Sequence, residues 1–122
     1  MESGIESGQP TTPAPFSCAI RRETERVVVT VEGDVDIATA PVLYARLRDA
    51  VDDSAKSVVA DFADVSFIDS SGVQCLLTAQ RDAESLGTTM IVHRPRPNVL
   101  LVFDPLGLTD QLVVEGASWP TT

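Results

Sequence analysis

Residues 58–77 read VVADFADVSFIDSSGVQCLL, and the pattern of apolar residues changes halfway along this stretch. Residues 57–62 are mostly apolar and rich in valine, as is typical of a strand buried in a parallel sheet. Residues 71–86 place apolar side chains at helical spacing along one stripe. The stretch therefore predicts a strand, then a polar junction that contains Asp69 and Ser70, then a helix.

The segments on both sides continue this alternation of strands and helices. Residues 16–20 and 26–32 are short apolar runs, the second rich in β-branched residues, and a charged turn joins them. This pattern predicts an antiparallel hairpin whose second strand ends at Gly33. A helix is expected over 39–52, where a threonine and a proline precede apolar residues at helical spacing. After the central stretch, we expect a strand over 88–93, a helix from the turn at 94–97 to about Gly107, and a last strand over 111–114.

The order of these elements predicts an α/β fold. We expect a mixed, mostly parallel sheet of four or five strands, with an antiparallel N-terminal edge strand and three or four helices. A chain of 122 residues with 43% hydrophobic content is long enough for one domain with one core, placed at residues 16–115. Residues 1–15 are rich in Gly, Ser, Thr and Pro and are predicted to form a disordered tail, and residues 116–122 a short C-terminal tail.

The charge and the overall pattern of the chain limit its partners and its location. The formal net charge of −9 disfavours binding to nucleic acid or directly to an anionic membrane. The N-terminus resembles no signal peptide and no apolar run is long enough to span a membrane, so we expect a cytoplasmic protein. Cys18 and Cys75 have no metal-ligand spacing and are expected to be buried, reduced thiols, with redox regulation as the alternative.

The motifs of common α/β enzymes are incomplete in this sequence. The seven glycines form no phosphate-binding loop, so no nucleotide cofactor is expected. Ser70 lacks the flanking glycine of a hydrolase nucleophile, and the single histidine, His93, lies at a strand end. Lys56 precedes a strand instead of following one, unlike the lysine of a phosphoacceptor domain. Because aspartates are common in turns, those at the predicted strand ends do not predict a metal site: Asp34, Asp36, Asp61, Asp64 and Asp69.

Three stretches together resemble the STAS domain of bacterial anti-sigma factor antagonists. They are GDVDIATA at 33–40, the opening stretch at 58–77, and VFDPLGL at 102–108. Each is weak alone, but all three occur in the family's order and at its separations, and the resemblance covers residues 16–114. It implies a STAS fold and a protein that acts by binding, without enzymatic activity.

The resemblance also implies a phosphorylation switch. The serine directly after the family's aspartate is phosphorylated by an anti-sigma factor kinase, which places the phosphorylation site at Ser70, with Ser71 as the fallback. The unphosphorylated protein binds the kinase and releases a sigma factor for transcription, and a phosphatase resets the switch. Asp69 is expected to orient the Ser70 hydroxyl, and the expected partner-binding residues are Asp34, Asp36, Asp69, Ser71, Gly72 and Gln74.

The sequence departs from the family pattern in two places that concern partners. Gln74 occupies a position that is often small in the family, and it is expected to restrict which kinases bind. The predicted third helix contains VLLVF, which is apolar on all sides. We favour an exposed apolar patch there that includes Leu100 and Leu101 and serves a partner or a dimer, with deeper burial of the helix as the alternative.

Two other functions remain open for the same fold. One is a scaffold subunit of a large stress-signalling assembly. The other is a STAS accessory subunit of a membrane lipid transporter ATPase, for which no phosphorylation is needed.

Overall fold

A computed structural model of the protein describes residues 16–51, 56–103 and 112–116. The described chain forms a five-stranded sheet whose strand order follows the sequence, β1-β2-β3-β4-β5. Strand β1 (Ser17–Arg22) is antiparallel to β2 (Arg26–Val35), and β2 is parallel to β3 (Ser57–Ile68). Strands β4 (Thr89–His93) and β5 (Val113–Glu115) continue the parallel part. The predicted mixed sheet with an antiparallel edge strand is confirmed.

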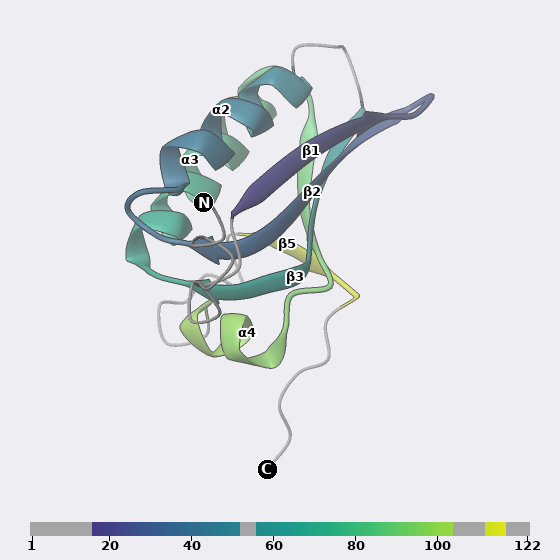
Figure 1. The fold of residues 1–122 in the computed structure, drawn as a ribbon. Helices are drawn as coiled ribbons and strands as arrows, with labels where there is room; N and C mark the ends of the chain where they lie inside the picture. The colour runs from purple at the N-terminus through teal and green to yellow at the C-terminus, as the bar shows by residue number, and fades with distance from the viewer. Residues whose placement is uncertain (1–15, 52–55, 104–111, 117–122) are drawn as a thin grey trace, which may run out of the picture.

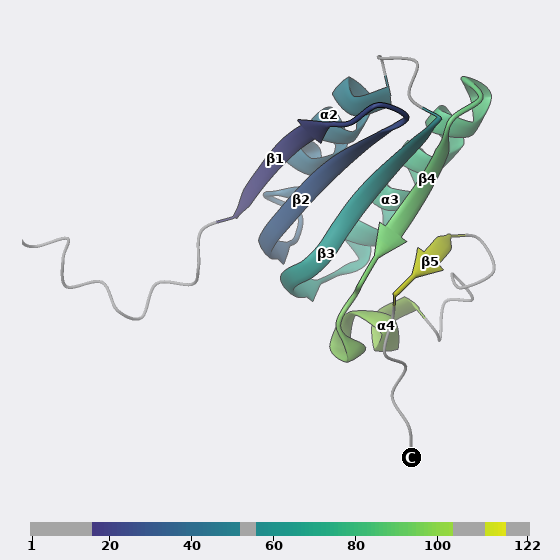
Figure 2. The ribbon, with the colours of Figure 1, turned by 90° about the vertical axis from the view of Figure 1, so that its right-hand side faces the viewer.

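Three helices lie in the described part of the chain. Helices α2 (Ala40–Val51) and α3 (Ser70–Ser85) cover one face of the sheet, and α4 (Pro97–Phe103) packs against β3 near the lower end of the sheet (Figure 1). Figure 2 looks onto the opposite sheet face, with α2 and α3 behind the strands. The predicted tails at 1–15 and 117–122 and the predicted helix end near Gly107 lie outside the described residues.

The core fills the space between the sheet and helices α2 and α3 and continues under α4. Apolar residues of α2 and α3 face inward at helical spacing, and valines of β2 and β3 meet them at alternate positions. The largest fully buried side chains are Phe62, Phe103, Leu43, Leu47, Ile68, Leu76, Met90 and Leu100. This core fixes the end of the sheet where β2 and β3 pass into α2 and α3.

Strands β2 and β3 are longer than the sequence predicts. Gly33 does not end β2, because it lies inside the strand with a φ of 96°, next to a shift in the β2–β3 register. Strand β3 runs beyond Phe62 to Ile68, since Val65 and Ile68 continue the buried row while the residues between them face outward. These extensions carry both strands to the edge where Asp34 and Asp69 lie.

Two side chains of the helices differ from their predicted positions. Leu86 was expected on the buried stripe of α3 but is 66% exposed, because the helix ends at Ser85. Leu100 is fully buried, so it takes no part in an exposed patch. It points into the core with Val99 and Phe103, while Leu101 points outward and is 58% exposed. Dimerisation through this helix stays a prediction that now depends on Leu101.

Candidate functional site

The junction between β3 and α3 is built around the carboxylate of Asp69. Asp69 is the N-cap of α3, and its Oδ1 accepts hydrogen bonds from the backbone N–H of Ser71 at 2.9 Å and of Gly72 at 3.2 Å. Aspartate is favoured here because it satisfies backbone donors that have no partner within the helix. The carboxylate thus caps the helix, and its expected role in orienting the Ser70 hydroxyl stays a prediction. Ser70, the first residue of the helix, is exposed.

Gly72 lets the first turn of α3 lie directly on the ends of β2 and β3. A Cβ at this position would be 2.6 Å from Cγ1 of Ile68 and 2.6 Å from Cγ1 of Val35, and both of these side chains are buried. A real side chain needs more room than that. Gly72 is itself buried, so its part in the site is to position Ser70 and Ser71 above the strand ends.

The loop between β2 and α2 is held by hydrogen bonds from its own side chains. Oδ1 of Asp36 accepts from the N–H of Ala38 at 3.0 Å and of Thr39 at 3.1 Å. The Thr39 hydroxyl donates to the carbonyl of Asp34 at 2.8 Å and accepts from the N–H of Asp36 at 2.9 Å. Because these short polar side chains satisfy the turn locally, residues 34–39 have a defined shape.

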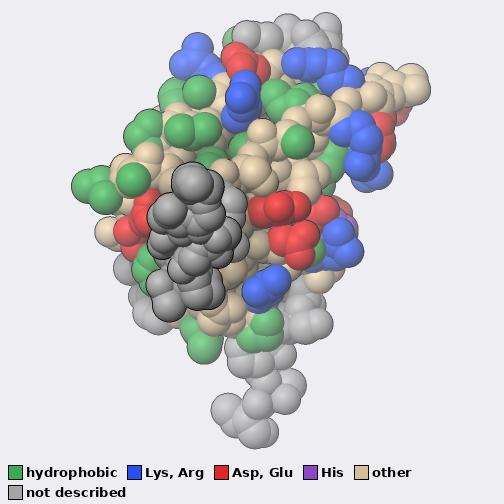
Figure 3. All heavy atoms as spheres, in the orientation of Figure 1, with side chains coloured by type: hydrophobic (Ala, Val, Ile, Leu, Met, Phe, Trp, Pro, Cys, Tyr) green, Lys and Arg blue, Asp and Glu red, His purple; other side chains and the backbone are tan. Residues whose placement is uncertain are grey.

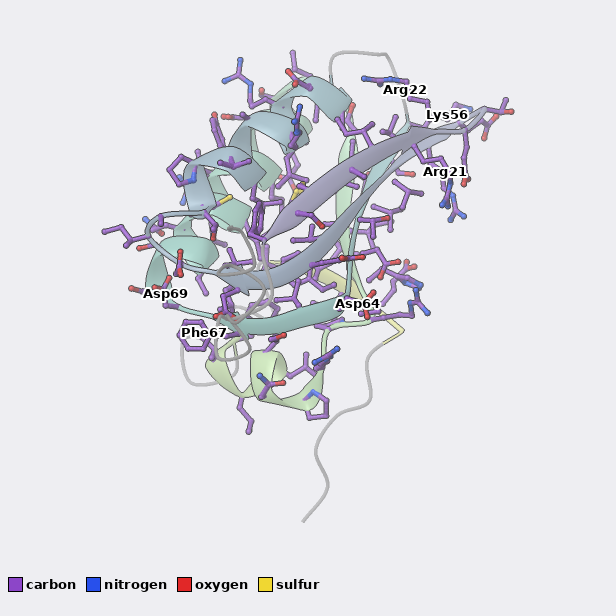
Figure 4. All side chains as sticks on the ribbon, in the orientation of Figure 1. Arg21, Arg22, Lys56, Asp64, Phe67 and Asp69 are labelled. Atoms are coloured by element: carbon purple, nitrogen blue, oxygen red, sulfur yellow. The ribbon has the colours of Figure 1, made fainter. Side chains whose placement is uncertain are left out.

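The two loops form one surface beside Ser70. The N–H of Asp69 donates to the carbonyl of Val35 at 3.1 Å, and Asp34 is paired with Phe67 across the parallel strands. This brings together six of the seven residues predicted for the site: Asp34, Asp36, Asp69, Ser70, Ser71 and Gly72. We call the surface formed by residues 34–39 and 67–71 the switch edge. Figure 4 shows Phe67 and Asp69 at this edge, with Arg21, Arg22 and Lys56 at the far end of the sheet.

Two exposed apolar side chains at the switch edge were not singled out from the sequence. Ile37 is 78% exposed at the tip of the β2–α2 loop, and Phe67 is 48% exposed two residues before Asp69. Exposed apolar residues beside a polar site are typical of protein-binding surfaces. Both residues lie within the quoted motifs, but neither motif by itself indicates that they are exposed. Their exposure was missed because the predicted strand stopped at residue 62 and Ile37 was read only as part of a motif.

Gln74, the remaining predicted residue, lies one turn further along α3 and lines a groove between α2 and α3. The groove has a volume of about 370 Å³ and opens widely to solvent. Its lining consists of Ile37, Ala40, Pro41 and Tyr44 on one side and Ser71, Gln74, Cys75 and Thr78 on the other. None of these residues carries a charge at neutral pH. The groove therefore continues the switch edge as a mainly apolar surface.

The two thiols are poorly reactive. Burial raises the pKa of Cys18 to about 11, although the charge of Arg46 opposes the rise, and burial together with Cys18 raises the pKa of Cys75 to about 12. Both cysteines are free, and Cys75 lies in the core cluster with Cys18 packed against it. Since the thiolate is the reactive form, this placement favours the structural interpretation of both residues.

Other kinds of site find little support in the described residues. Within residues 16–51, 56–103 and 112–116, no group of three or more His, Cys, Asp or Glu side chains is placed to hold a metal ion. Among the helices that the structure describes, none is long and apolar enough to cross a membrane. His93 lies at the end of β4 on the far side of the sheet from α3, beside Gly116.

The chain belongs to the STAS family. A family model described as "Mlab, STAS domain" matches residues 18–115, which is most of the chain. The matched residues run from β1 to the end of β5 and include the switch edge.

Solved structures with a similar fold include anti-sigma factor antagonists. The unphosphorylated form of the anti-sigma factor antagonist SpoIIAA is 26% identical, with a TM-score of 0.68 over 80% of this chain and 87% of that chain. Its phosphorylated form, from Bacillus, is 26% identical, with a TM-score of 0.62 over 80% of this chain and 90% of that chain. An anti-sigma factor antagonist from Mycobacterium paratuberculosis is 25% identical, with a TM-score of 0.73 over 88% of this chain and 87% of that chain.

Proposed function

We propose that this protein is an anti-sigma factor antagonist whose binding is switched at Ser70. In its unphosphorylated form it binds an anti-sigma factor kinase through the switch edge, so that a sigma factor is released. Phosphorylation of Ser70 ends this binding, and a phosphatase restores it. The observation that carries the proposal is the exposed hydroxyl of Ser70 at the start of α3, beside two exposed apolar side chains and three carboxylates.

The surroundings of Ser70 suit a protein interface. Ile37 and Phe67 provide apolar contact area, and both project from backbone that hydrogen bonds already hold in place. A surface ordered before binding loses less conformational entropy when the complex forms. The carboxylates of Asp34, Asp36 and Asp69 favour a partner with basic groups facing them. The switch edge therefore fits a protein partner better than an acidic one such as nucleic acid.

A phosphate on Ser70 is expected to act on binding and to leave the fold intact. Near the N-terminus of α3 it meets a helix dipole worth about 0.3 to 1 kcal/mol, but Asp69 already occupies the first backbone donors and repels it. In the complex, the added charge of about −1.5 to −2 would lose its water beside three carboxylates. Without a matched cation this costs several kcal/mol, which lowers affinity at least about 100-fold.

Similarity to SpoIIAA, whose structure exists in both phosphorylated and unphosphorylated forms, supports the same proposal. The transporter-subunit alternative requires no exposed acceptor hydroxyl and no phosphorylation. A partner of the transporter-ATPase class, bound equally well before and after treatment with kinase and ATP, would favour that alternative.

The test is phosphorylation of the purified chain by its anti-sigma factor kinase with ATP. We expect one phosphate per chain on Ser70, found by mass spectrometry, and none on Ser70→Ala. The matched control is Ser71→Ala, which removes the neighbouring hydroxyl and is expected to be phosphorylated normally. Calorimetry should show that Ser70→Ala still binds the kinase while Ser70→Glu binds weakly. Normal phosphate uptake by Ser70→Ala would disprove the assignment.

A further inference from the structure

We infer that the groove between α2 and α3 selects the partner, by accepting apolar side chains from one of the partner's helices. The inference rests on the proposed function, since it concerns the same partner, but it assigns a second contact region beyond the phosphorylation site. The residues that would set the selectivity are Ile37 at the mouth of the groove and Gln74 on its rim.

The groove exists because small side chains leave space between α2 and α3 near the switch edge. These side chains are Ala40, Ser71 and Cys75. Further along, the hydroxyl of Tyr44 donates to Oδ2 of Asp82 at 2.5 Å and joins the two helices. Tyr44 lines the groove near this contact, and Ser71, the neighbour of Ser70, lines it at the start of α3. A partner that covers Ser70 therefore reaches the groove without any rearrangement of this chain.

Ile37 is placed to begin this contact. It is 78% exposed although the side chains of Thr39 and Asp36 hold the backbone before and after it, so its exposure is a property of an ordered loop. Figure 3 shows hydrophobic side chains gathered over the α2 and α3 side of the molecule, with acidic side chains next to them. Apolar patches with a polar border on a single domain are typical of interaction sites.

The charge distribution argues against a second copy of this chain as the occupant. A symmetric dimer through the groove would bring Asp36 and Asp69 of one copy close to the same acidic edge of the other. Like charges held together in an interface are unfavourable. A membrane surface is disfavoured for the same reason. A different protein that presents a helix with apolar residues at i, i+3 or i+4 matches a groove running between two helices.

The Gln74 amide limits which partner side chains can occupy the groove, because it needs a hydrogen-bond partner when it is covered. This amide lies on the α3 side of the groove, where the partner's helix would cover it. A buried amide left without a hydrogen-bond partner lowers affinity by about tenfold or more. The preferred partner therefore has a polar group opposite Gln74 and apolar side chains opposite Ile37 and Pro41.

The experiment measures binding of the purified anti-sigma factor kinase, without ATP, to variants of the full chain. Ile37→Ser is expected to weaken binding about tenfold or more while its unfolding temperature stays near that of the wild type. Leu86→Ser is the matched control, because Leu86 is another strongly exposed apolar residue, located beyond the end of α3, and this variant should bind as the wild type does.

The Gln74→Ala variant tests selectivity separately from stability. Its affinity is measured for the cognate kinase and for kinases from related partner-switching systems. We expect Gln74→Ala to bind the non-cognate kinases more tightly, relative to the cognate kinase, than the wild type does. Binding by Ile37→Ser within twofold of the wild type, with unchanged selectivity in Gln74→Ala, would overturn this inference together with the contact assigned to Ile37. The switch at Ser70 would still stand, because the phosphorylation experiment tests it separately. A wild-type chain that binds no anti-sigma factor kinase would overturn both.

Discussion

At the scale of single residues, Gly72 is the position where the fold of the site is most constrained. Alanine is intrinsically the better helix former by about 1 kcal/mol. Its methyl group would nevertheless meet Val35 and Ile68 at 2.6 Å, and both are β-branched side chains in a packed core. We expect Gly72→Ala to lower the free energy of unfolding by about 1 to 3 kcal/mol, as overpacking does.

Chemical denaturation with circular dichroism measures this change. Arg81→Ala, an exposed position within the same helix, is the control and should change stability by less than about 0.5 kcal/mol. A Gly72→Ala protein as stable as the wild type would mean that helix propensity outweighs the contact with β2 and β3. The same residue shows what sequence reasoning reaches: the motif led to Gly72 as a partner-binding residue, but its close packing against Val35 and Ile68 was not predicted.

At the scale of elements, two substitutions at the N-cap of α3 distinguish the hydrogen bonds that Asp69 accepts from the effect of its charge. Asp69→Ala removes the acceptor for Ser71 N–H and Gly72 N–H and is expected to lower stability by about 1 kcal/mol. Asp69→Asn keeps a capping oxygen without the charge, so its unfolding temperature should remain close to that of the wild type. Thermal unfolding of the two variants tests the difference, and an equal loss in both would show that the charge does the capping.

The order and type of the described elements were predicted from the sequence, but their ends were not. Helical and strand periodicities identify buried stripes, and they placed helices α2 and α3 and every strand except β3 within a few residues. The last six residues of β3 alternate too irregularly to be recognised, because the strand bends between α3 and α4 there. Periodicity also failed at Leu86, which is exposed because it lies past the end of the helix.

The polar residues of the candidate site were singled out from the sequence, whereas its exposed apolar residues were not. The motifs led to Asp36, Asp69 and Ser70, which the structure brings to one edge. No pattern within a single segment indicates that Ile37 and Phe67 are exposed, because their exposure depends on how β2 and β3 end side by side.

At the scale of the whole molecule, an ion pair links the centre of the sheet to the segment that leads into α4. Oδ2 of Asp61 accepts from Arg94 at 2.9 Å, and Oδ1 accepts from the N–H of Ala63 at 3.1 Å. Burial raises the pKa of Asp61, but the hydrogen bonds from Arg94 and Ala63 and the charge of Arg94 together lower it below its ordinary value.

This shift predicts how stability depends on pH. A carboxyl whose pKa is lowered in the folded state contributes stability above its unfolded pKa of about 3.9, and the contribution is lost as the pH falls through the folded value. Asp61→Asn should therefore lower the free energy of unfolding at pH 7 by about 1 kcal/mol or less, since Arg94 is half-exposed. The difference from the wild type should disappear at the acidic end of a urea titration series.

Asp64→Asn is the matched control for this pH dependence. Asp64 is more exposed than Asp61 and lies 3.8 Å from Arg96, so its ion pair should add little at any pH. If Asp61→Asn and Asp64→Asn follow the same pH profile, the link through Arg94 does not stabilise the fold.

The length of β3 has a practical consequence for studying this protein on a surface. The sequence contains one lysine, Lys56, which lies just before β3, whereas Ser70 lies two residues after its end. Figure 4 shows Lys56 at the opposite end of the sheet from Asp69. Once the α-amino group is blocked, an amine-reactive dye or biosensor chip attaches at that single position. Every molecule on the chip would then present the switch edge to the solution in the same orientation.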